Sequence, residues 1–171
     1  QLLKKSPDFE IGGFFSNPLS LCLDNAIETN GIIYPSLDDL CENSDCIILC
    51  VPDKILPALI TSLSRLHTNG KIIVSTSYEV YASDLANGYD NTFIVMNTAA
   101  DFEKVSSDLD NITIVCEGMG KDLDIFIDFV KNGGIKCSHV TRDELMLYRC
   151  AIELMTVGIS SVIKASSYLA G

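Results

Sequence analysis

The chain has 171 residues, of which 47% are hydrophobic and 20% are charged, and this composition excludes intrinsic disorder, collagen-like repeats and other low-complexity classes. The formal net charge of −11 argues against a protein that binds the phosphate backbone of nucleic acids. A chain of this length forms one hydrophobic core, so we expect one α/β domain with at most a helical appendage.

Strand-like and helical segments alternate in the first half of the chain. A strand at 10–16 ends at Asn17-Pro18, which predicts a helix N-cap followed by proline in the first helical turn, and Gly31 is expected to end that helix. The run DCIILCV (45–51) has no polar alternation, which is typical of a strand buried on both faces of a parallel sheet. The other predicted elements are a strand at 32–35, a helix after its cap Ser36, and a helix over DKILPALITSLSRL that stops at Gly70.

The second half continues this alternation. Short apolar runs predict strands at 71–77, 92–97, 112–116 and 135–140, with helices from about Ser83 and over KDLDIFIDFVKNGG. A final helix is predicted from Arg142 to about Leu169. We therefore predict a Rossmann-like α/β fold, with a mainly parallel sheet, helices on both of its faces and a long C-terminal helix.

The final helix is apolar over more than half of its circumference, which is more than one sheet face can cover. We predict that it packs against another subunit, with Met155 and Ile159 in the interface. Residues 1–141 then form the Rossmann-like domain, and residues 142–171 begin a helical dimerisation domain. The apolar positions are Leu145, Leu147, Tyr148, Ala151, Ile152, Leu154, Met155, Ile159, Val162, Ile163 and Leu169.

The sequence predicts a soluble protein of the cytoplasm. No run of about 18 apolar residues occurs, and the amino end, QLLKKSPDFE, lacks the layout of a signal peptide. The acidic net charge does not exclude a phosphate-bearing cofactor, because backbone N–H groups at a helix N-terminus can hold one locally. We expect small-molecule partners, and neither nucleic acid nor a membrane.

Seven cysteines are many for this length, but their number is odd and no CxxC pair occurs. This pattern favours reduced, structural thiols over a disulfide framework or a zinc site. In an apolar strand such as 45–51, a thiol behaves as a small hydrophobic group. The cysteines are Cys22, Cys41, Cys46, Cys50, Cys116, Cys137 and Cys150.

A dinucleotide-binding unit opens with a strand, a glycine-rich turn and a helix whose N-terminus holds the pyrophosphate. This chain opens with QLLKKSPDF, which has the pattern of a helix tail that runs into a turn. If the chain is such a unit, its first strand and glycine loop are missing from this sequence. Gly118 and Gly120 imitate part of a GxGxxG motif, but Leu123 stands where the third glycine belongs, which favours an ordinary strand-to-helix turn.

Five segments in order resemble pyrroline-5-carboxylate reductase and its relatives in the 6-phosphogluconate-dehydrogenase-like group. They are FFSNPLSL, ENSDCIILCVPDKILPALITSL, GKIIVSTS, FIVMNTAA and TRDELMLYRCAIELM, and the resemblance that they mark extends over nearly the whole chain. The resemblance implies an NAD(P)-binding Rossmann domain, a homodimer formed through the helical domain, and the NAD(P)H-dependent reduction of the C=N bond of pyrroline-5-carboxylate in proline biosynthesis.

The resemblance also implies a set of cofactor-binding residues. Ser16 and Asn17 match the strand end where the family contacts the adenosine ribose or its 2′-phosphate. No Asp or Glu stands there to bind a ribose diol, so NADP is favoured over NAD. Cys50, Val51 and Pro52 match the turn after the family's fourth strand, which borders the cofactor.

Asn97 and Thr98 match the family's Asn-Thr pair beside the nicotinamide. Ala99 follows them where the family has proline, and Asp53 follows Pro52 where reductases usually have a Lys-Pro turn. These departures leave the substrate open, and no catalytic acid or base is predicted, because the cofactor carries the hydride and the protein supplies orientation. A second hypothesis also stays open, namely a Rossmann-like interaction module that has lost catalysis and keeps the fold for dimerisation.

Other polar residues are better explained by structure than by chemistry. His67 lies near a predicted helix C-terminus, where partial positive charge suits the helix dipole. His139 has Arg142 and Asp143 nearby, but no nucleophile accompanies it, and a surface helix start explains Asp143. Three acidic residues are expected to form a solvated helix face rather than a metal site, namely Asp122, Asp124 and Asp128.

Overall fold

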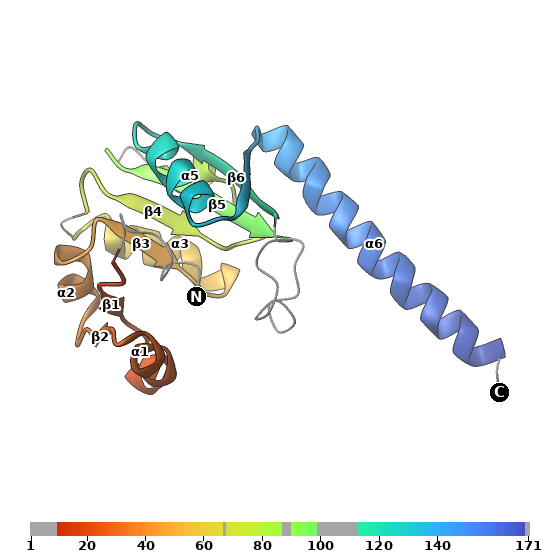
Figure 1. Ribbon diagram of the computed structural model, residues 1–171, viewed down its shortest axis with the longest axis horizontal. Helices are drawn as coiled ribbons and strands as arrows, with labels where there is room; N and C mark the ends of the chain where they lie inside the picture. The colour runs from red at the N-terminus through yellow and green to blue at the C-terminus, as the bar shows by residue number, and fades with distance from the viewer. Residues whose placement is uncertain (1–9, 67, 87–89, 99–112, 170–171) are drawn as a thin grey trace.

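The chain folds around two sheets, which Figure 1 shows in a computed structural model that describes residues 10–66, 68–86, 90–98 and 113–169, with side chains up to 155. All strand pairs are parallel except β5 with β6. The two-stranded sheet contains β1 (Gly13–Phe14) and β2 (Ile32–Ile33). The five-stranded sheet has the order β3 (Cys46–Leu49), β4 (Ile72–Ser75), β5 (Thr92–Thr98), β6 (Thr113–Met119) and β7 (Lys136–His139).

Helices cover both faces of the larger sheet. One face packs against α2 (Leu37–Glu42), α3 (Leu56–Leu63), α4 (Ala82–Leu85) and the start of α6 (Arg142–Leu169), and the opposite face packs against α5 (Leu123–Asn132). The remaining helical segments are η2 (Leu19–Cys22), α1 (Leu23–Thr29) and η3 (Asp53–Ile55). The predicted Rossmann-like, mainly parallel α/β fold with a long C-terminal helix is therefore confirmed.

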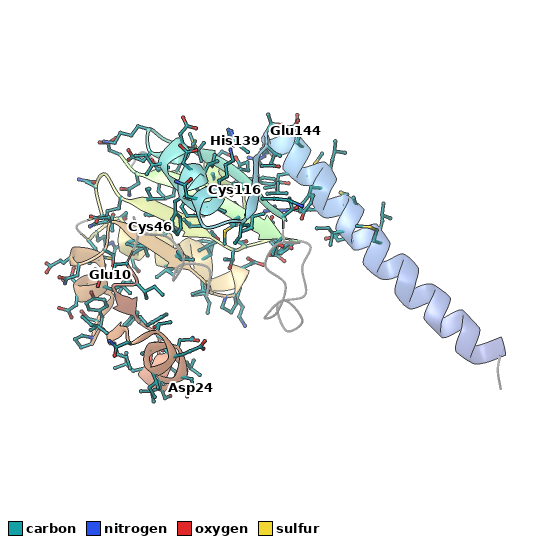
Figure 2. All side chains as sticks on the ribbon, viewed as in Figure 1. Glu10, Asp24, Cys46, Cys116, His139 and Glu144 are labelled. Atoms are coloured by element: carbon teal, nitrogen blue, oxygen red, sulfur yellow. The ribbon has the colours of Figure 1, made fainter. Side chains whose placement is uncertain are left out.

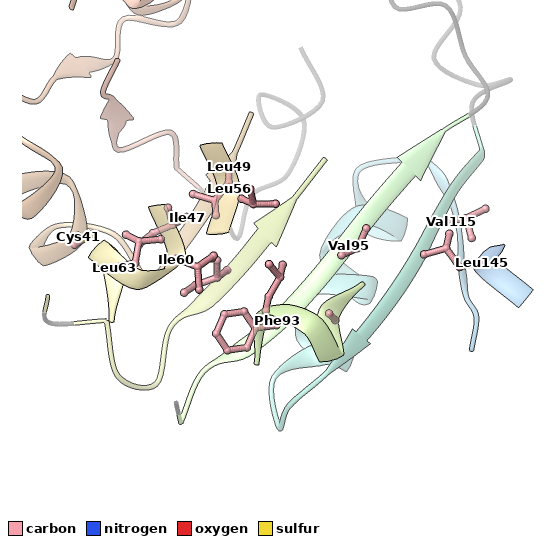
Figure 3. Packing of buried hydrophobic residues seen from close by; sticks show 13 residues of the cluster. Cys41, Ile47, Leu49, Leu56, Ile60, Leu63, Phe93, Val95, Val115 and Leu145 are labelled. Carbon is pink, nitrogen blue, oxygen red and sulfur yellow. The ribbon is translucent and has the colours of Figure 1, made fainter. Parts of the chain in front are cut away.

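Alternating side chains of the strands build a hydrophobic cluster on each face of the sheet, as expected for a pleated strand. Ile73 and Phe93 point into the cluster that Figure 3 shows, whereas Val74 and Ile94 point into the cluster beneath α5. All four side chains are fully buried. The central strands β4 and β5 thus hold the two layers of helices together.

The prediction that 45–51 is buried on both faces is wrong for one residue of β3. Ile48 is 40% exposed, although Ile47 and Leu49 on the other face are buried. α5 packs mainly against β5, β6 and β7, and Ile48 of β3 lies at the border of an apolar hollow beside this helix. Ile48 is therefore left partly uncovered.

The predicted start and end of the first helix are both wrong. Asn17 does not cap it, because the 3₁₀ turn begins at Leu19 with Pro18 as its cap and without a side-chain cap. The helix ends at Thr29, two residues before Gly31, because Asn30 takes the left-handed conformation (φ 56°) that closes it.

The predictions for the other helix boundaries have mixed outcomes. α3 ends at Leu63, and Gly70 (φ +76°) instead shapes the turn into β4, where its N–H donates to the carbonyl of Asp90. Ser36 caps α2 as predicted, since its hydroxyl accepts from the N–H of Asp39. The predicted bounds of the last helix, Arg142 to Leu169, are those of α6. The division into two domains at this point stays a prediction.

The start of α6 is defined by reciprocal hydrogen bonds between Thr141 and Glu144. The N–H and hydroxyl of Thr141 donate to Glu144 Oε2 (2.8 and 2.9 Å), and these bonds lower the pKa of the Glu144 carboxyl. Leu145 follows and is fully buried against the sheet. Beyond this anchor the helix extends away from the body of the molecule (Figure 1).

The glycines that imitate a nucleotide-binding loop have a structural role. Gly118 lies within β6, where an added Cβ would stand 3.0 Å from the carbonyl oxygen of Phe93. Gly120 has a φ of +124°, and an added Cβ would lie 2.6 Å from Thr92 Cα. The strand-to-helix turn expected from the sequence explains Gly120, whereas Gly118 lies within the strand and packs closely against β5. Gly13 in β1 also allows a close approach, since an added Cβ there would overlap the carbonyl oxygen of Ile32.

We expect Gly120→Ala to be more destabilising than Gly70→Ala. Both positions have positive φ, which destabilises alanine by roughly 1–2 kcal/mol. Gly70 has open space around it, whereas Gly120 meets the backbone of Thr92 and adds an overpacking penalty of about 1–3 kcal/mol. Urea unfolding of the two variants measures the difference, and equal midpoints would contradict the packing role of Gly120.

Candidate functional site

The candidate site is the edge of the sheet at which the parallel strands end. β3, β4 and β5 are mutually parallel, so the residues that follow them meet at one edge. In open α/β sheets, ligands bind in the crevice outside the carboxyl ends of the strands. We call the segments Ser16–Asn17, Cys50–Pro52, Thr76–Tyr78 and Asn97–Thr98 the carboxyl edge.

The two sheets are separated by an opening between β1 and β3. Among the described strands, β1 pairs with β2 and β3 pairs with β4, so each has one unpaired edge. A cavity of about 630 Å³ is lined by residues at the amino ends of β1, β3 and β4, which therefore start at the same side of the molecule. Figure 2 labels Glu10 and Cys46, which line this cavity from the two sheets.

A second, smaller hollow of about 140 Å³ lies on the α5 face of the sheet. Its lining is apolar and includes the exposed Ile48 of β3 together with Met96 of β5. Phe126 and Phe129 of α5 close it on the other side.

Ser16 and Asn17 follow β1 and belong to the smaller sheet. Asn17 is exposed, and the half-buried Ser16 donates its hydroxyl to the carbonyl of Pro18 (2.8 Å). Neither of them carries charge. The described contacts do not join them to the other segments of the carboxyl edge.

Cys50, Val51 and Pro52 form the turn between β3 and η3. Cys50 and Pro52 are exposed, whereas Val51 packs against the cluster that contains α3. The neighbouring strand is attached directly, because the N–H of Thr76 donates to the carbonyl of Leu49 (3.3 Å). The turn thus presents a thiol and a proline ring to solvent at the end of β3.

Asn97 is a buried residue, with 1% of its surface exposed, and all of its side-chain polar atoms are hydrogen-bonded within the protein. Its Nδ2 donates to the carbonyls of Ser77 (2.9 Å) and Met96 (3.0 Å), and its Oδ1 accepts from Arg149 Nε (2.9 Å). The hydroxyl of Tyr78 donates to the carbonyl of Thr98. The structure therefore connects Asn97 and Thr98 to the turn after β4.

Arg149 is a residue of this edge that the sequence analysis missed. It is 7% exposed, and its Nη2 donates to the carbonyls of Ser77 (3.1 Å) and Val80 (3.0 Å). Its guanidinium also lies over the ring of Tyr81, 4.7 Å from the centroid. The signal in the sequence is a single charged residue within an apolar helix stripe. Arg149 lies one helical turn after Leu145 and directly after Tyr148.

The other candidate residues do not gather into a catalytic centre. His139 and Asp143 are exposed, and Asp143 lies in the first turn of α6 as predicted. In the described part of the chain, no group of three His, Cys, Asp or Glu side chains is placed to hold a metal ion. Asp124 and Asp128 are exposed on α5, opposite its buried phenylalanines. His67 lies outside the described residues.

All seven cysteines are free thiols. Burial raises the pKa of Cys46 to about 12. Cys116 and Cys137 on the neighbouring strands β6 and β7 have their sulfurs 3.5 Å apart. Their hydrogen bond raises the pKa of the fully buried Cys116 and lowers that of Cys137.

Comparison with known proteins identifies the fold. No protein-family model matches the sequence, and no curated protein matches it. A protein from Bacteroides fragilis designated an NADP oxidoreductase is similar, with a TM-score of 0.76 and 12% identity over 93% of this chain and 61% of that chain. A reductive aminase from Aspergillus terreus in complex with NADPH4, cyclohexanone and allyl amine has a TM-score of 0.70 and 13% identity over 91% and 56%.

A third solved structure is a 1-pyrroline-5-carboxylate reductase from Streptococcus pyogenes, with a TM-score of 0.59 and 14% identity over 91% of this chain and 66% of that chain. The chain thus spans less than two thirds of the length of each of these proteins. At such identities the likeness shows the shared fold. Among the described helices, none combines the length and the apolar character needed to cross a membrane.

We expect Asn97→Ala to lower the free energy of unfolding by about 2 kcal/mol, because it leaves buried hydrogen-bonding groups without a partner. The control is Asn43→Ala, which removes an exposed hydrogen bond to the carbonyl of Asp39 and should change stability by less than about 0.5 kcal/mol. Chemical denaturation of both variants measures the difference. Equal losses in the free energy of unfolding would show that the buried hydrogen bonds of Asn97 stabilise the fold no more than the exposed one of Asn43.

Proposed function

We propose that this chain forms the nucleotide-binding body of an NADPH-dependent reductase that reduces the C=N bond of an imine, of the pyrroline-5-carboxylate reductase type. The observation that carries the proposal is the carboxyl edge of the five-stranded sheet, where the parallel strands β3 and β5 end in Cys50–Pro52 and Asn97–Thr98, which the resemblance assigns to the cofactor. The third assigned segment, Ser16–Asn17, follows β1 of the smaller sheet. The shared fold with an NADP oxidoreductase, a reductive aminase and a pyrroline-5-carboxylate reductase supports the same class of reaction.

The proposal assigns residues of this edge to the two ends of an NADP molecule. Ser16 and Asn17 offer a hydroxyl and an amide without a carboxylate, so a 2′-phosphate on the adenosine ribose meets no negative charge from these two residues. Cys50–Pro52 would border the cofactor along the end of β3. Tyr78 and Thr98 would stand at the nicotinamide end, held by their mutual hydrogen bond.

When bound, NADPH supplies the hydride, and the protein supplies binding and orientation. Asn97 has no exposed polar atom to offer a ligand, so its role in this proposal is to hold the backbone of Ser77 and Met96 in place. Pro52 and Tyr78 are exposed at the edge and would shield the reacting carbon from water. In this proposal the described residues orient the cofactor and the substrate, and none of them acts as an acid or a base.

The proposal also accounts for the opening between β1 and β3. A parallel strand in this place would pair with both unpaired edges, and a glycine turn at its carboxyl end would stand between Ser16 and Cys50, where a pyrophosphate needs backbone N–H groups. A helix following that turn would cover Ile48 and the apolar hollow in front of α5. The unpaired edges of β1 and β3 among the described strands are thus compatible with the proposed dinucleotide-binding sheet.

NADPH is expected to protect Cys50 from alkylation in the full-length protein. Cys50 lies at the carboxyl edge, whereas Cys150 is exposed on α6 and serves as an internal control. At a cofactor concentration ten times its Kd, modification of Cys50 by iodoacetamide should slow about tenfold, because only the free protein reacts. Peptide mass spectrometry follows both thiols. Unchanged rates at Cys50 with NADPH bound would remove this turn from the cofactor site.

We also propose that the protein is a homodimer through α6. The side of this helix that points away from the body carries Met146, Leu147, Leu154 and Met155, and Leu154 and Met155 are 73% and 58% exposed in the single chain. Exposed apolar side chains in a row indicate an interaction surface. The side chain of Ile159, which we predict to share this interface, lies outside the described residues.

Met155→Glu and Ile159→Glu are each expected to shift the protein toward monomer, because the interface would bury an unpaired charge at a penalty of several kcal/mol. Glu153→Gln on an exposed position of the same helix is the control. Sedimentation velocity measures the outcome. A monomeric parent protein, or variants that assemble like the parent, would exclude this interface.

A further inference from the structure

Arg149 holds together backbone segments that are far apart in the sequence. Its three bonded N–H groups reach the side chain of Asn97 and the carbonyls of Ser77 and Val80, which are 52 to 72 residues away along the chain. Asn97 in turn donates to the same Ser77 carbonyl. Arg149 and Asn97 therefore form one connected network at the ends of β4 and β5.

Burial makes an arginine at this position costly, because its charge loses its hydration. The charge is buried, and no carboxylate among the described residues forms an ion pair with it. Glu117, a buried carboxylate, accepts from the N–H of Ala82 (2.7 Å) instead. An apolar residue here would avoid that desolvation, but it would leave the acceptors on Asn97 and Val80 without their donor. What an apolar residue lacks is the planar fork that reaches three acceptors at once, and lysine lacks it too.

Arg142 provides an internal comparison on the same helix. Its guanidinium also lies over the Tyr81 ring, 4.1 Å from the centroid, and it forms an ion pair with Asp84 (2.9 Å). Both partners of that pair are half-exposed, and the contacts attach α6 to α4 rather than to the strand ends. Arg142 therefore shares the helix and the aromatic partner of Arg149, but not its contacts with the carboxyl edge.

We propose that Arg149 is a positioning residue for the reaction described above. By holding Asn97 and the turn of residues 77–80, it fixes Tyr78 and Thr98, which face the nicotinamide end of the site. This inference rests on the proposed function. It also makes the shape of the site depend on how α6 is attached to the sheet, because Arg149 lies only one turn beyond the buried Leu145.

Kinetics of Arg149→Met, Arg149→Lys and Arg142→Met in the full-length protein test the proposal, with NADPH and 1-pyrroline as substrates. A loss of positioning lowers kcat, and misplacements near 1 Å can reduce rates by about a hundredfold. We expect Arg149→Met to lower kcat at least about tenfold while the Kd for NADPH changes less than about threefold. Arg149→Lys should recover part of kcat, and Arg142→Met should leave it unchanged.

Amide hydrogen exchange gives a second readout that requires no turnover. Arg149→Met should speed exchange at residues 75–81 and 94–98 about tenfold relative to β3, and Arg142→Met should not. If the parent protein fails to reduce 1-pyrroline, the proposed function fails, and the exchange result alone decides whether Arg149 holds the strand ends. Unchanged exchange there, or an unchanged kcat in an active Arg149→Met variant, would overturn the proposal.

Discussion

The parallel register of β3, β4 and β5 is the constraint on which the rest of the structure depends. Leu49 at the end of β3 pairs with Ser75 at the end of β4, and Ser75 pairs with Val95. β5 continues beyond this level to Thr98, so Asn97 projects past the end of β4 and lies beside the turn that follows it. The hydrogen bond from Asn97 to Ser77 is a direct result of this difference in strand length.

The same register explains why the last helix is part of the site. β6 pairs with β5 in the antiparallel direction, and Val115 is the register partner of Asn97. Val115 belongs to the cluster that buries Leu145 at the start of α6. Arg149 on the next turn of α6 therefore faces the projecting end of β5. The packing of α6 against one face of the sheet thus also brings Arg149 into contact with the carboxyl edge.

Much of the fold could be predicted from the sequence, because its central strands and its last helix have clear periodic patterns. The pattern from Arg142 onward predicts α6 to the residue, and the cap at Ser36 is correct. Two features escaped local analysis. The end of α3 at Leu63 has no sequence signal comparable to Gly70, and the exposure of Ile48 depends on which helix covers β3.

The candidate site was only partly predictable for a similar reason. The resemblance singles out Asn97, but its burial and its bonds to Ser77 and Arg149 arise from contacts more than 19 residues apart in the sequence. Arg149 stands in an apolar stripe, where the sequence shows an exception without showing its partners. Cofactor contacts at Ser16, Asn17, Cys50, Val51, Pro52 and Thr98 stay predictions.

Titration of NADPH into the full-length protein, followed by the fluorescence of the cofactor, tests the central claim most directly. The account predicts saturable binding of NADPH with a Kd well below millimolar, and weaker binding of NADH, because neither Ser16 nor Asn17 carries a carboxylate for a ribose diol. An absence of binding at millimolar NADPH would contradict the account. It would favour a fold that has been kept for interaction rather than for catalysis.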